Sequence, residues 1–263
     1  AAGAERGAGM SVKLGIPSKG RLMQDTLDWF AARGVTIERT GTDREYAGSV
    51  DVDGIELVLL SAGEIPGELA RGRIALGVTG SDVVQEKVAG WADKIAPVTE
   101  LGFGHADLIL AVPKTWTDVS TLDDLDAVAD AFWKAHGFRL RIATKYHRLV
   151  RAHLNTAGVA GYQLVDSQGA TEGTVANLTA EAIADITSTG ATLDANHLKI
   201  IGDVIHASQA TLFRSRTATL DANHLKLIGD VIHASQATLF RSKTARLNTA
   251  EAAHLDAFLS QLT

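Results

Sequence analysis

The chain has 263 residues, of which 46% are hydrophobic and 21% are charged, and its net charge at pH 7 is −6. This length gives room for about two modest domains, and the negative charge argues against a broad nucleic-acid-binding surface. The absence of cysteine excludes disulfides, thiolate catalysis and thiolate metal sites, and it fits a reducing cytosol. No apolar run reaches the roughly 18 residues that a membrane span needs. We therefore expect a cytoplasmic protein that binds neither membranes nor nucleic acids.

The first nine residues differ in character from the rest of the chain. They are alanines and glycines with one Glu-Arg pair, without the apolar core of a secretory signal. Met10 has the position of a natural start, so residues 1–9 are predicted to be a disordered extension.

Short apolar runs alternate with helical patterns through the first 90 residues. Asp53-Gly54 is a two-residue hairpin signal, and Ser81 is a candidate helix cap. Strands alternating with short helices predict a mainly parallel α/β sheet. The strands are expected at 12–16, 35–39, 46–52, 55–60 and 74–78, and the helices at 21–32, 64–71 and 82–88.

The same alternation resumes near Gly104 and predicts a second small α/β unit. A last helix is expected over 248–262, with Asn248 as its cap and an apolar stripe along one side. The other strands of this half are expected at 106–112, 140–143, 162–165 and 180–186, and the helices at 121–132 and 146–154.

A turn rich in hydroxyl groups separates the strand 180–186 from the helical turn 193–198. Its sequence, Thr187-Ser-Thr-Gly190, suits a phosphate, because the first backbone N–H groups of a helix are unpaired and hydroxyls add further donors. Gly190 permits a positive φ and a close approach of the backbone to a ligand. The alternative is an ordinary helix N-cap, since Ser and Thr are common there.

Residues 191–217 and 218–244 form a tandem repeat that is identical at 25 of 27 positions. Two such similar copies indicate a duplication, because solenoids need three or more diverged units. Only the first copy follows the hydroxyl-rich turn, so we expect it to supply the helix after that turn. The second copy is then redundant, supplies the strand that returns to the first unit, or pairs with a sheet edge.

The stretch Glu181–Leu193 resembles the phosphoribosyl-pyrophosphate loop of the ATP phosphoribosyltransferase family, which catalyses the first step of histidine biosynthesis. The resemblance spans about Val12 to Phe213 and is closest to the short form, which lacks a C-terminal regulatory domain. Six further stretches match that family in order, namely 15–22, 61–66, 76–82, 102–107, 143–148 and 165–172.

This resemblance implies an α/β fold of the two-lobed, periplasmic-binding-protein-like (type II) class, with a cleft between two small mixed sheets. Lobe 1 would comprise residues 10–103 with a returning segment at about 199–217, or its repeat 226–244. Lobe 2 would comprise 104–198 with the phosphate loop. The duplicated segment 218–244 and the C-terminal helix within 245–263 complete the chain.

The family reaction joins the phosphoribosyl group of phosphoribosyl pyrophosphate (PRPP) to N1 of ATP, with Mg²⁺ and release of pyrophosphate. Because pyrophosphate is a good leaving group once its charge is neutralised, no covalent nucleophile is needed. The protein must position two polyanions and stabilise an oxocarbenium-like centre. A site of cations, hydroxyls and carboxylates is therefore expected.

The matched motifs assign the candidate site residues. Asp185 and Glu172 are expected on ribose hydroxyls, directly or through a Mg²⁺ ion held mainly by the substrate. Many relatives carry an arginine near Ser61 and a glycine at the position of His197, and this chain has neither. The catalytic candidates are Asp185, Glu172 and Lys19, and the candidates for the PRPP phosphate are Thr187, Ser188, Thr189, Gly190, Ala191 and Thr192. The candidates for ATP and pyrophosphate are Gly20, Arg21, Arg44, Ser61, Glu64, Gly80, Asp82, Lys145 and Tyr146.

Short forms of the family imply a separate regulatory subunit that resembles histidyl-tRNA synthetase, and a homodimer as the catalytic building block. Two alternatives remain open at this point. One is a non-catalytic two-lobed protein that binds small anions, and the other is a family member inactivated by the duplication.

Overall fold

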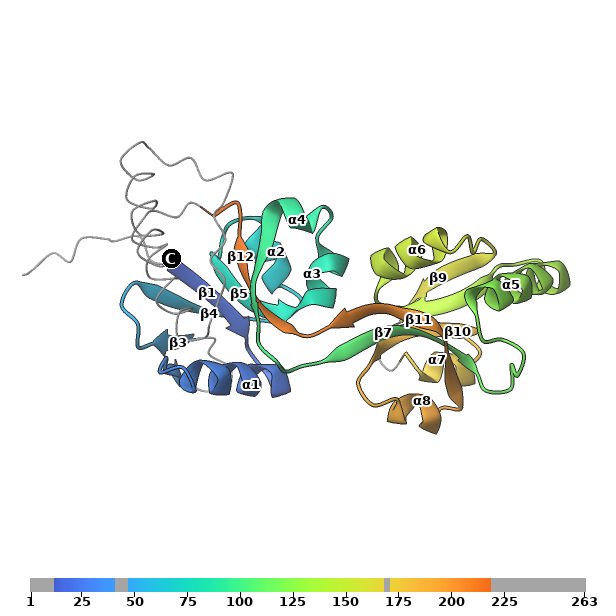
Figure 1. Cartoon of the computed structure of the whole chain (residues 1–263), viewed down its shortest axis with the longest axis horizontal. Helices are drawn as coiled ribbons and strands as arrows, with labels where there is room; N and C mark the ends of the chain where they lie inside the picture. The colour runs from blue at the N-terminus through green and yellow to red at the C-terminus, as the bar shows by residue number, and fades with distance from the viewer. Residues whose placement is uncertain (1–11, 41–46, 168–170, 219–263) are drawn as a thin grey trace, which may run out of the picture. The chain divides into compact units, whose positions relative to one another are not determined.

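The computed structural model describes residues 12–40, 47–167 and 171–218. The described residues divide into two compact units, one holding residues within 12–103 and 210–218, the other residues within 104–209 (Figure 1). Arg44, the N-terminal extension, the C-terminal helix and all but Ala218 of the second repeat lie outside the described residues. None of the described helices is both long and apolar enough to cross a membrane.

The first unit is built on a five-stranded sheet with the order β4-β1-β5-β12-β6. β1 runs parallel to both of its neighbours, β4 and β5, whereas β12 runs antiparallel to β5 and β6. A separate antiparallel pair, β2 with β3, lies in the same unit. The strands are β1 (Val12–Pro17), β2 (Ile37–Thr40), β3 (Ala47–Val50), β4 (Ile55–Leu60), β5 (Leu76–Gly80), β6 (Ile95–Glu100) and β12 (Ala210–Ser215).

Helices cover both faces of this sheet (Figure 1). α1 (Gly20–Ala31) packs Phe30 into one apolar cluster with Leu212 of β12, and the neighbouring Phe213 enters the cluster of the opposite face. Burial on both faces explains why β1 and β4 are largely apolar, with one charged residue each, Lys13 and Glu56. The opposite face is covered by α2 (Ile65–Ala70), α3 (Ser81–Lys87) and α4 (Trp91–Lys94).

The second unit has a five-stranded sheet with the order β11-β7-β10-β8-β9. β10, β8 and β9 are parallel neighbours, and β7 runs antiparallel to both β10 and β11. The strands are β7 (Ala106–Pro113), β8 (Leu140–Thr144), β9 (Tyr162–Asp166), β10 (Ala182–Thr187) and β11 (Leu198–Ser208).

Its helices also lie on two faces of the sheet (Figure 1). α5 (Leu122–His136) and α6 (His147–Thr156) share one apolar cluster, and residues of α7 (Gly173–Ala176) and α8 (Ala191–Ala195) share the other. α5 begins with a capping box, in which the Thr121 hydroxyl accepts from the Asp124 amide (3.2 Å) and the Asp124 carboxylate accepts from the Thr121 amide (2.9 Å).

Two local predictions were wrong. The turn at Asp53-Gly54 exists, with Gly54 at φ 84°, but β4 pairs with β1 and β3 pairs with β2. Parallel pairing with β1 buries Leu57 and Leu59 in the core, and this tertiary gain outweighs the local hairpin preference. Ser81 is the first residue of α3, and Gly80 occupies the N-cap position without a capping side chain.

The first repeat copy supplies α8, β11 and β12. The return to the first unit begins at Ala210, because β11 belongs to the sheet of the second unit. At the junction of the two copies, the Thr217 hydroxyl lies 3.1 Å from the Ala70 carbonyl at the end of α2, and Ala218 packs against the core of the first unit. The end of the first copy is therefore fixed to the first unit.

His197, directly after α8, adopts the left-handed conformation with φ 54°. This is the conformation that glycine at a helix C-terminus provides without a steric penalty, whereas a residue with a Cβ loses about 1 kcal/mol there. Histidine at this position therefore takes a strained backbone conformation.

We therefore predict that His197→Gly raises the free energy of unfolding by about 0.5–1 kcal/mol, because it removes the Cβ clash at the end of α8. The repeat offers a matched control, since His224→Gly makes the same change in the second copy. Chemical denaturation of both variants checks the prediction. A larger gain from His224→Gly would mean that the chain folds with its second copy.

Candidate functional site

Three loops of the first unit gather at one edge of its sheet. They follow β1, β4 and β5, which are neighbouring parallel strands, so their carboxyl ends lie at the same edge. Ligands of open α/β sheets bind at such edges. These loops hold seven of the predicted residues, namely Lys19, Gly20, Arg21, Ser61, Glu64, Gly80 and Asp82.

The first of these loops carries two exposed cations. Lys19 occupies the N-cap position of α1, and Gly20 takes a left-handed φ of 78° that lets the chain turn into the helix. The Arg21 side chain is 82% exposed and lies 3.7 Å from Asp25, a distance at which a surface ion pair is weak. Both cations are therefore accessible to an anionic ligand.

The second loop is held by a contact between two of the predicted residues. The amide and the hydroxyl of Ser61 both donate to Oε2 of Glu64, at 2.9 and 2.6 Å. These hydrogen bonds lower the pKa of the Glu64 carboxyl. The Thr79 hydroxyl donates to the Ala62 carbonyl (2.9 Å) and so links this loop to β5. Asp82, in the first turn of α3, is buried.

The second unit repeats this arrangement at the carboxyl ends of β8, β9 and β10, which are also parallel neighbours. Lys145 and Tyr146 follow β8, and the Tyr146 amide donates to the Thr144 hydroxyl (2.9 Å). His147 Nε2 and Asp166 Oδ1 lie 2.7 Å apart and join the start of α6 to the end of β9. Sequence reasoning missed His147, although it directly follows the Lys145-Tyr146 pair.

The hydroxyl-rich turn at the end of β10 is held by its own first side chain. The Thr187 hydroxyl accepts from the Gly190 amide (3.0 Å), and Gly190 has φ 75°, as the sequence predicts. Gly190 is the N-cap residue of α8 and has no side chain to cap the helix, while the Thr189 hydroxyl accepts from the Ala191 amide (3.4 Å). The alternative of an ordinary Ser/Thr cap is therefore not what the structure adopts. Ser188 and Thr192 are exposed beside the first amides of α8.

Two carboxylates stand near this turn in sequence. Asp185 is half-buried in β10 and accepts from the Ile186 amide (2.8 Å). Glu172 is half-buried at the N-cap position of α7. Over the described ranges, no three His, Asp or Glu side chains come together as a metal site. These carboxylates could supply one or two oxygen ligands, so any Mg²⁺ would need further ligands from the substrate and water.

The predicted residues that the structure describes thus fall into two groups, one in each unit. Two mixed α/β units, with the chain passing out at Phe103 and back at Ala210, define the periplasmic-binding-protein-like (type II) class of fold. The site in each unit is an edge of loops, rich in hydroxyls and backbone amides, of the kind that binds anions.

Comparison with solved structures supports this class. The chain superposes on the ATP phosphoribosyl transferase (HisG:HisZ) complex from Thermotoga maritima with a TM-score of 0.63 and 21% identity, covering 85% of this chain and 98% of that one. It also matches a probable amino-acid ABC transporter extracellular-binding protein from Bacillus subtilis with a TM-score of 0.50 and 13% identity, covering 86% and 91% of the two chains.

Sequence comparison identifies the family. The family described as "HisG: ATP phosphoribosyltransferase" matches residues 61–219. An ATP phosphoribosyltransferase of Cereibacter sphaeroides is 71% identical over 209 residues, which are 79% of this chain and 89% of the relative. One of Mesorhizobium japonicum is 48% identical over 208 residues, 78% of this chain and 90% of the relative. The chain belongs to the ATP phosphoribosyltransferase family, a family of pentosyltransferases.

The Ser61–Glu64 contact predicts a dependence of stability on pH. Because the folded-state pKa of Glu64 is lowered, the stability that its carboxylate contributes is fully present above the pKa of the unfolded state. It is lost as the pH falls through the folded-state pKa. Glu64→Gln should therefore destabilise the protein at neutral pH, and this difference should shrink in acid.

Urea denaturation of the two proteins across the acid range measures this difference. Glu100→Gln, an exposed change at the end of β6, serves as the control. A difference between Glu64→Gln and the unmodified protein that stays constant with pH would contradict a role for the charged carboxylate.

Proposed function

We propose that the chain transfers the phosphoribosyl group of PRPP to N1 of ATP with release of pyrophosphate, the first step of L-histidine biosynthesis. The observation that carries the proposal is the Thr187–Thr192 turn, which ends a central strand in a member of this family. Its exposed hydroxyls and the amides at the start of α8 suit the 5-phosphate of the sugar. Asp185 and Glu172 are the proposed partners of the ribose hydroxyls.

The cationic loops are the proposed partners of the polyphosphate chains. Lys19 and Arg21 would neutralise the departing pyrophosphate, and Lys145 would act in the same way at the edge of the second unit. Neutralisation lets the C1–O bond of PRPP break with its electron pair going to pyrophosphate, while the N1 lone pair of adenine forms the new C1–N1 bond. The remaining proposed contacts to ATP and pyrophosphate are Gly20, Arg44, Ser61, Glu64, Gly80, Asp82 and Tyr146.

We propose that Mg²⁺ binds mainly through the substrate. Asp185 or Glu172 would be its protein ligands, with the substrate and water completing its coordination. When bound, the ion would neutralise charge on the pyrophosphate group. The protein's own part is to hold the sugar and the two anions in reacting order.

We also propose a regulatory partner. The related Thermotoga maritima structure is described as a HisG:HisZ complex, and the sequence resembles the short form, which implies a regulatory subunit similar to histidyl-tRNA synthetase. A homodimer would be the catalytic building block. A cytoplasmic location fits substrates as charged as ATP and PRPP.

The tandem duplication is proposed to be surplus to the catalytic fold. The first copy alone supplies the described α8, β11 and β12, and the family match ends at residue 219, just inside the second copy. The inactivated-member alternative differs from this proposal in one respect, since it requires the second copy to interfere.

Asp185→Asn should reduce turnover by about 100-fold or more, because it removes the charge expected on the ribose while keeping the side chain's shape. The assay follows the ultraviolet absorbance of adenine, which shifts when N1 is alkylated, with ATP, PRPP and Mg²⁺ present, with and without the regulatory partner. Asp130→Asn on the exposed side of α5 is the control. Undiminished turnover in Asp185→Asn would remove this residue from the site, and an unmodified protein that binds PRPP without turnover would favour the anion-binding alternative.

Deleting residues 218–244 should leave turnover within about twofold of the unmodified chain, since surplus surface segments have small effects. The same absorbance assay and a thermal melt test this. A large gain in turnover after the deletion would instead support interference by the second copy.

A further inference from the structure

The connection from β9 to β10 carries Glu172 but contains little regular structure. In the described part of this connection, residues 167 and 171–181, the one helix is α7, which has four residues and no capping side chain. We call Thr171–Glu181 the crossover segment. Because its helix has only four residues, packing of that helix cannot hold the crossover segment by itself. The hydrogen bonds made by side chains of the segment are therefore needed to fix the position of Glu172.

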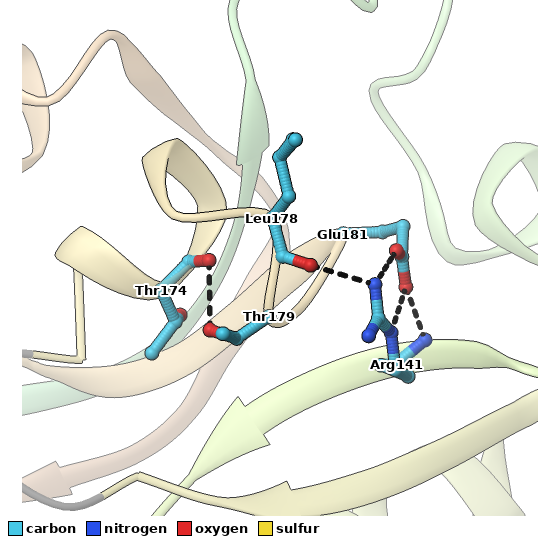
Figure 2. Close-up of polar contacts among 5 residues, drawn as sticks. All are labelled: Arg141, Thr174, Leu178, Thr179 and Glu181. Carbon is cyan, nitrogen blue, oxygen red and sulfur yellow. Dashed lines mark hydrogen bonds and ion pairs between the residues drawn. The ribbon is translucent and has the colours of Figure 1, made fainter.

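The first ties are hydroxyl groups. Beside Glu172, the hydroxyls of Ser167 and Thr171 are hydrogen-bonded to each other, and both residues are buried. The Thr171 carbonyl accepts from the amide (3.1 Å) and the hydroxyl (2.6 Å) of Thr174. The Thr174 carbonyl then accepts from the amide and the hydroxyl of Thr179, both at 3.0 Å (Figure 2). These bonds run the length of the crossover segment.

The last tie is Arg141 of β8, which reaches two points of the crossover segment (Figure 2). Its Nη2 donates to the Leu178 carbonyl (3.0 Å) and to Glu181 Oε1, and its Nε donates to Glu181 Oε2 (3.1 Å). The Arg141 amide donates to the same carboxylate (2.8 Å), and the Glu181 amide donates to the Arg141 carbonyl (3.0 Å). The Arg141 side chain thus holds two residues near the end of the crossover segment: Leu178, and Glu181, which leads into β10.

The electrostatics agree with a strong pairing. Burial alone would raise the pKa of Glu181, but the hydrogen bonds and the charge of Arg141 outweigh it and hold that pKa below the ordinary range. The pKa of Arg141 is raised, chiefly by its hydrogen bond to Glu181. Bidentate guanidinium–carboxylate pairs fix orientation as well as distance.

The pairing also holds a strained turn. Leu178 has φ 57° and is 80% exposed, so neither glycine-like freedom nor burial of its side chain favours this conformation. Such a conformation costs about 1–2 kcal/mol and persists only where the surroundings determine it. The hydrogen bond from Arg141 to the Leu178 carbonyl stabilises Leu178 in this conformation.

We propose that Arg141 is a positioning residue for PRPP. By fixing Leu178 and Glu181 it sets the crossover segment, and with it Glu172, against β10, which carries Asp185 and the Thr187–Thr192 turn. This inference rests on the proposed function. A positioning role differs from a purely structural one because it requires loss of Arg141 to raise KM for PRPP more than KM for ATP.

The test compares Arg141→Gln, Arg141→Lys and the unmodified chain in steady-state kinetics with each substrate varied in turn. Arg141→Gln should raise KM for PRPP by about tenfold, as loss of a supporting hydrogen bond commonly does, and KM for ATP by less than about twofold. Arg141→Lys keeps the charge but not the bidentate fork, so its KM for PRPP should be intermediate. Arg73→Gln, which loses a similar arginine–glutamate contact (3.2 Å to Glu68) in the first unit, is the matched control.

A second readout does not depend on turnover. Hydrogen–deuterium exchange without substrate should be faster at residues 171–187 in Arg141→Gln and unchanged there in Arg73→Gln. Unchanged exchange, an unchanged KM for PRPP, or an equal rise in both KM values would overturn the positioning role. Absence of turnover in the unmodified chain would instead count against the proposed function.

Discussion

Parallel pairing of neighbouring strands is the constraint on which both candidate sites depend. In the first unit β1 lies between β4 and β5, and in the second β8 lies between β10 and β9, with every one of these pairs parallel. Parallel strands place their carboxyl ends at one edge, so loops far apart in sequence meet there. The side chains of each loop are given by its local sequence, but the strand order of the sheet determines which loops lie next to one another.

The strands themselves are fixed by burial on two faces. Leu212 and Phe213 are adjacent in β12 yet belong to different apolar clusters, and Leu110 and Ala111 in β7 divide in the same way. A one-residue slip would exchange these faces, and the large and small side chains would no longer fit their partners. This is why a strand arriving from residue 210 can enter a sheet formed by residues 12–100 in one register.

Much of this could be predicted from the sequence, because runs such as 55–60 and 106–112 are apolar at all but one position and end at polar loops. The turn before α8 could also be predicted, since a glycine among hydroxyl residues is typical of turns, with an ordinary Ser/Thr helix cap as the alternative. The pairing partner of each strand could not be predicted from the sequence. The Asp53-Gly54 signal describes a turn and says nothing of whether β4 gains more beside β3 or β1. His147 was missed because a lone histidine has no signature until Asp166 is seen 2.7 Å away.

Two residues of the second unit have a strained backbone, and hydrogen bonds to the sheet hold both of them in place. Leu178 and His197, the two described non-glycine residues with positive φ, follow α7 and α8, which are the helices that flank β10. At Leu178 a guanidinium from the neighbouring strand compensates the backbone geometry, and at His197 the carbonyl accepts from the Lys114 amide (2.8 Å). Both strained residues are thus fixed by hydrogen bonds to the sheet, Leu178 through Arg141 of β8 and His197 through Lys114, directly after β7. The proposed PRPP site gains from such fixation, because freedom lost in the protein on folding does not have to be lost again when the flexible ligand binds.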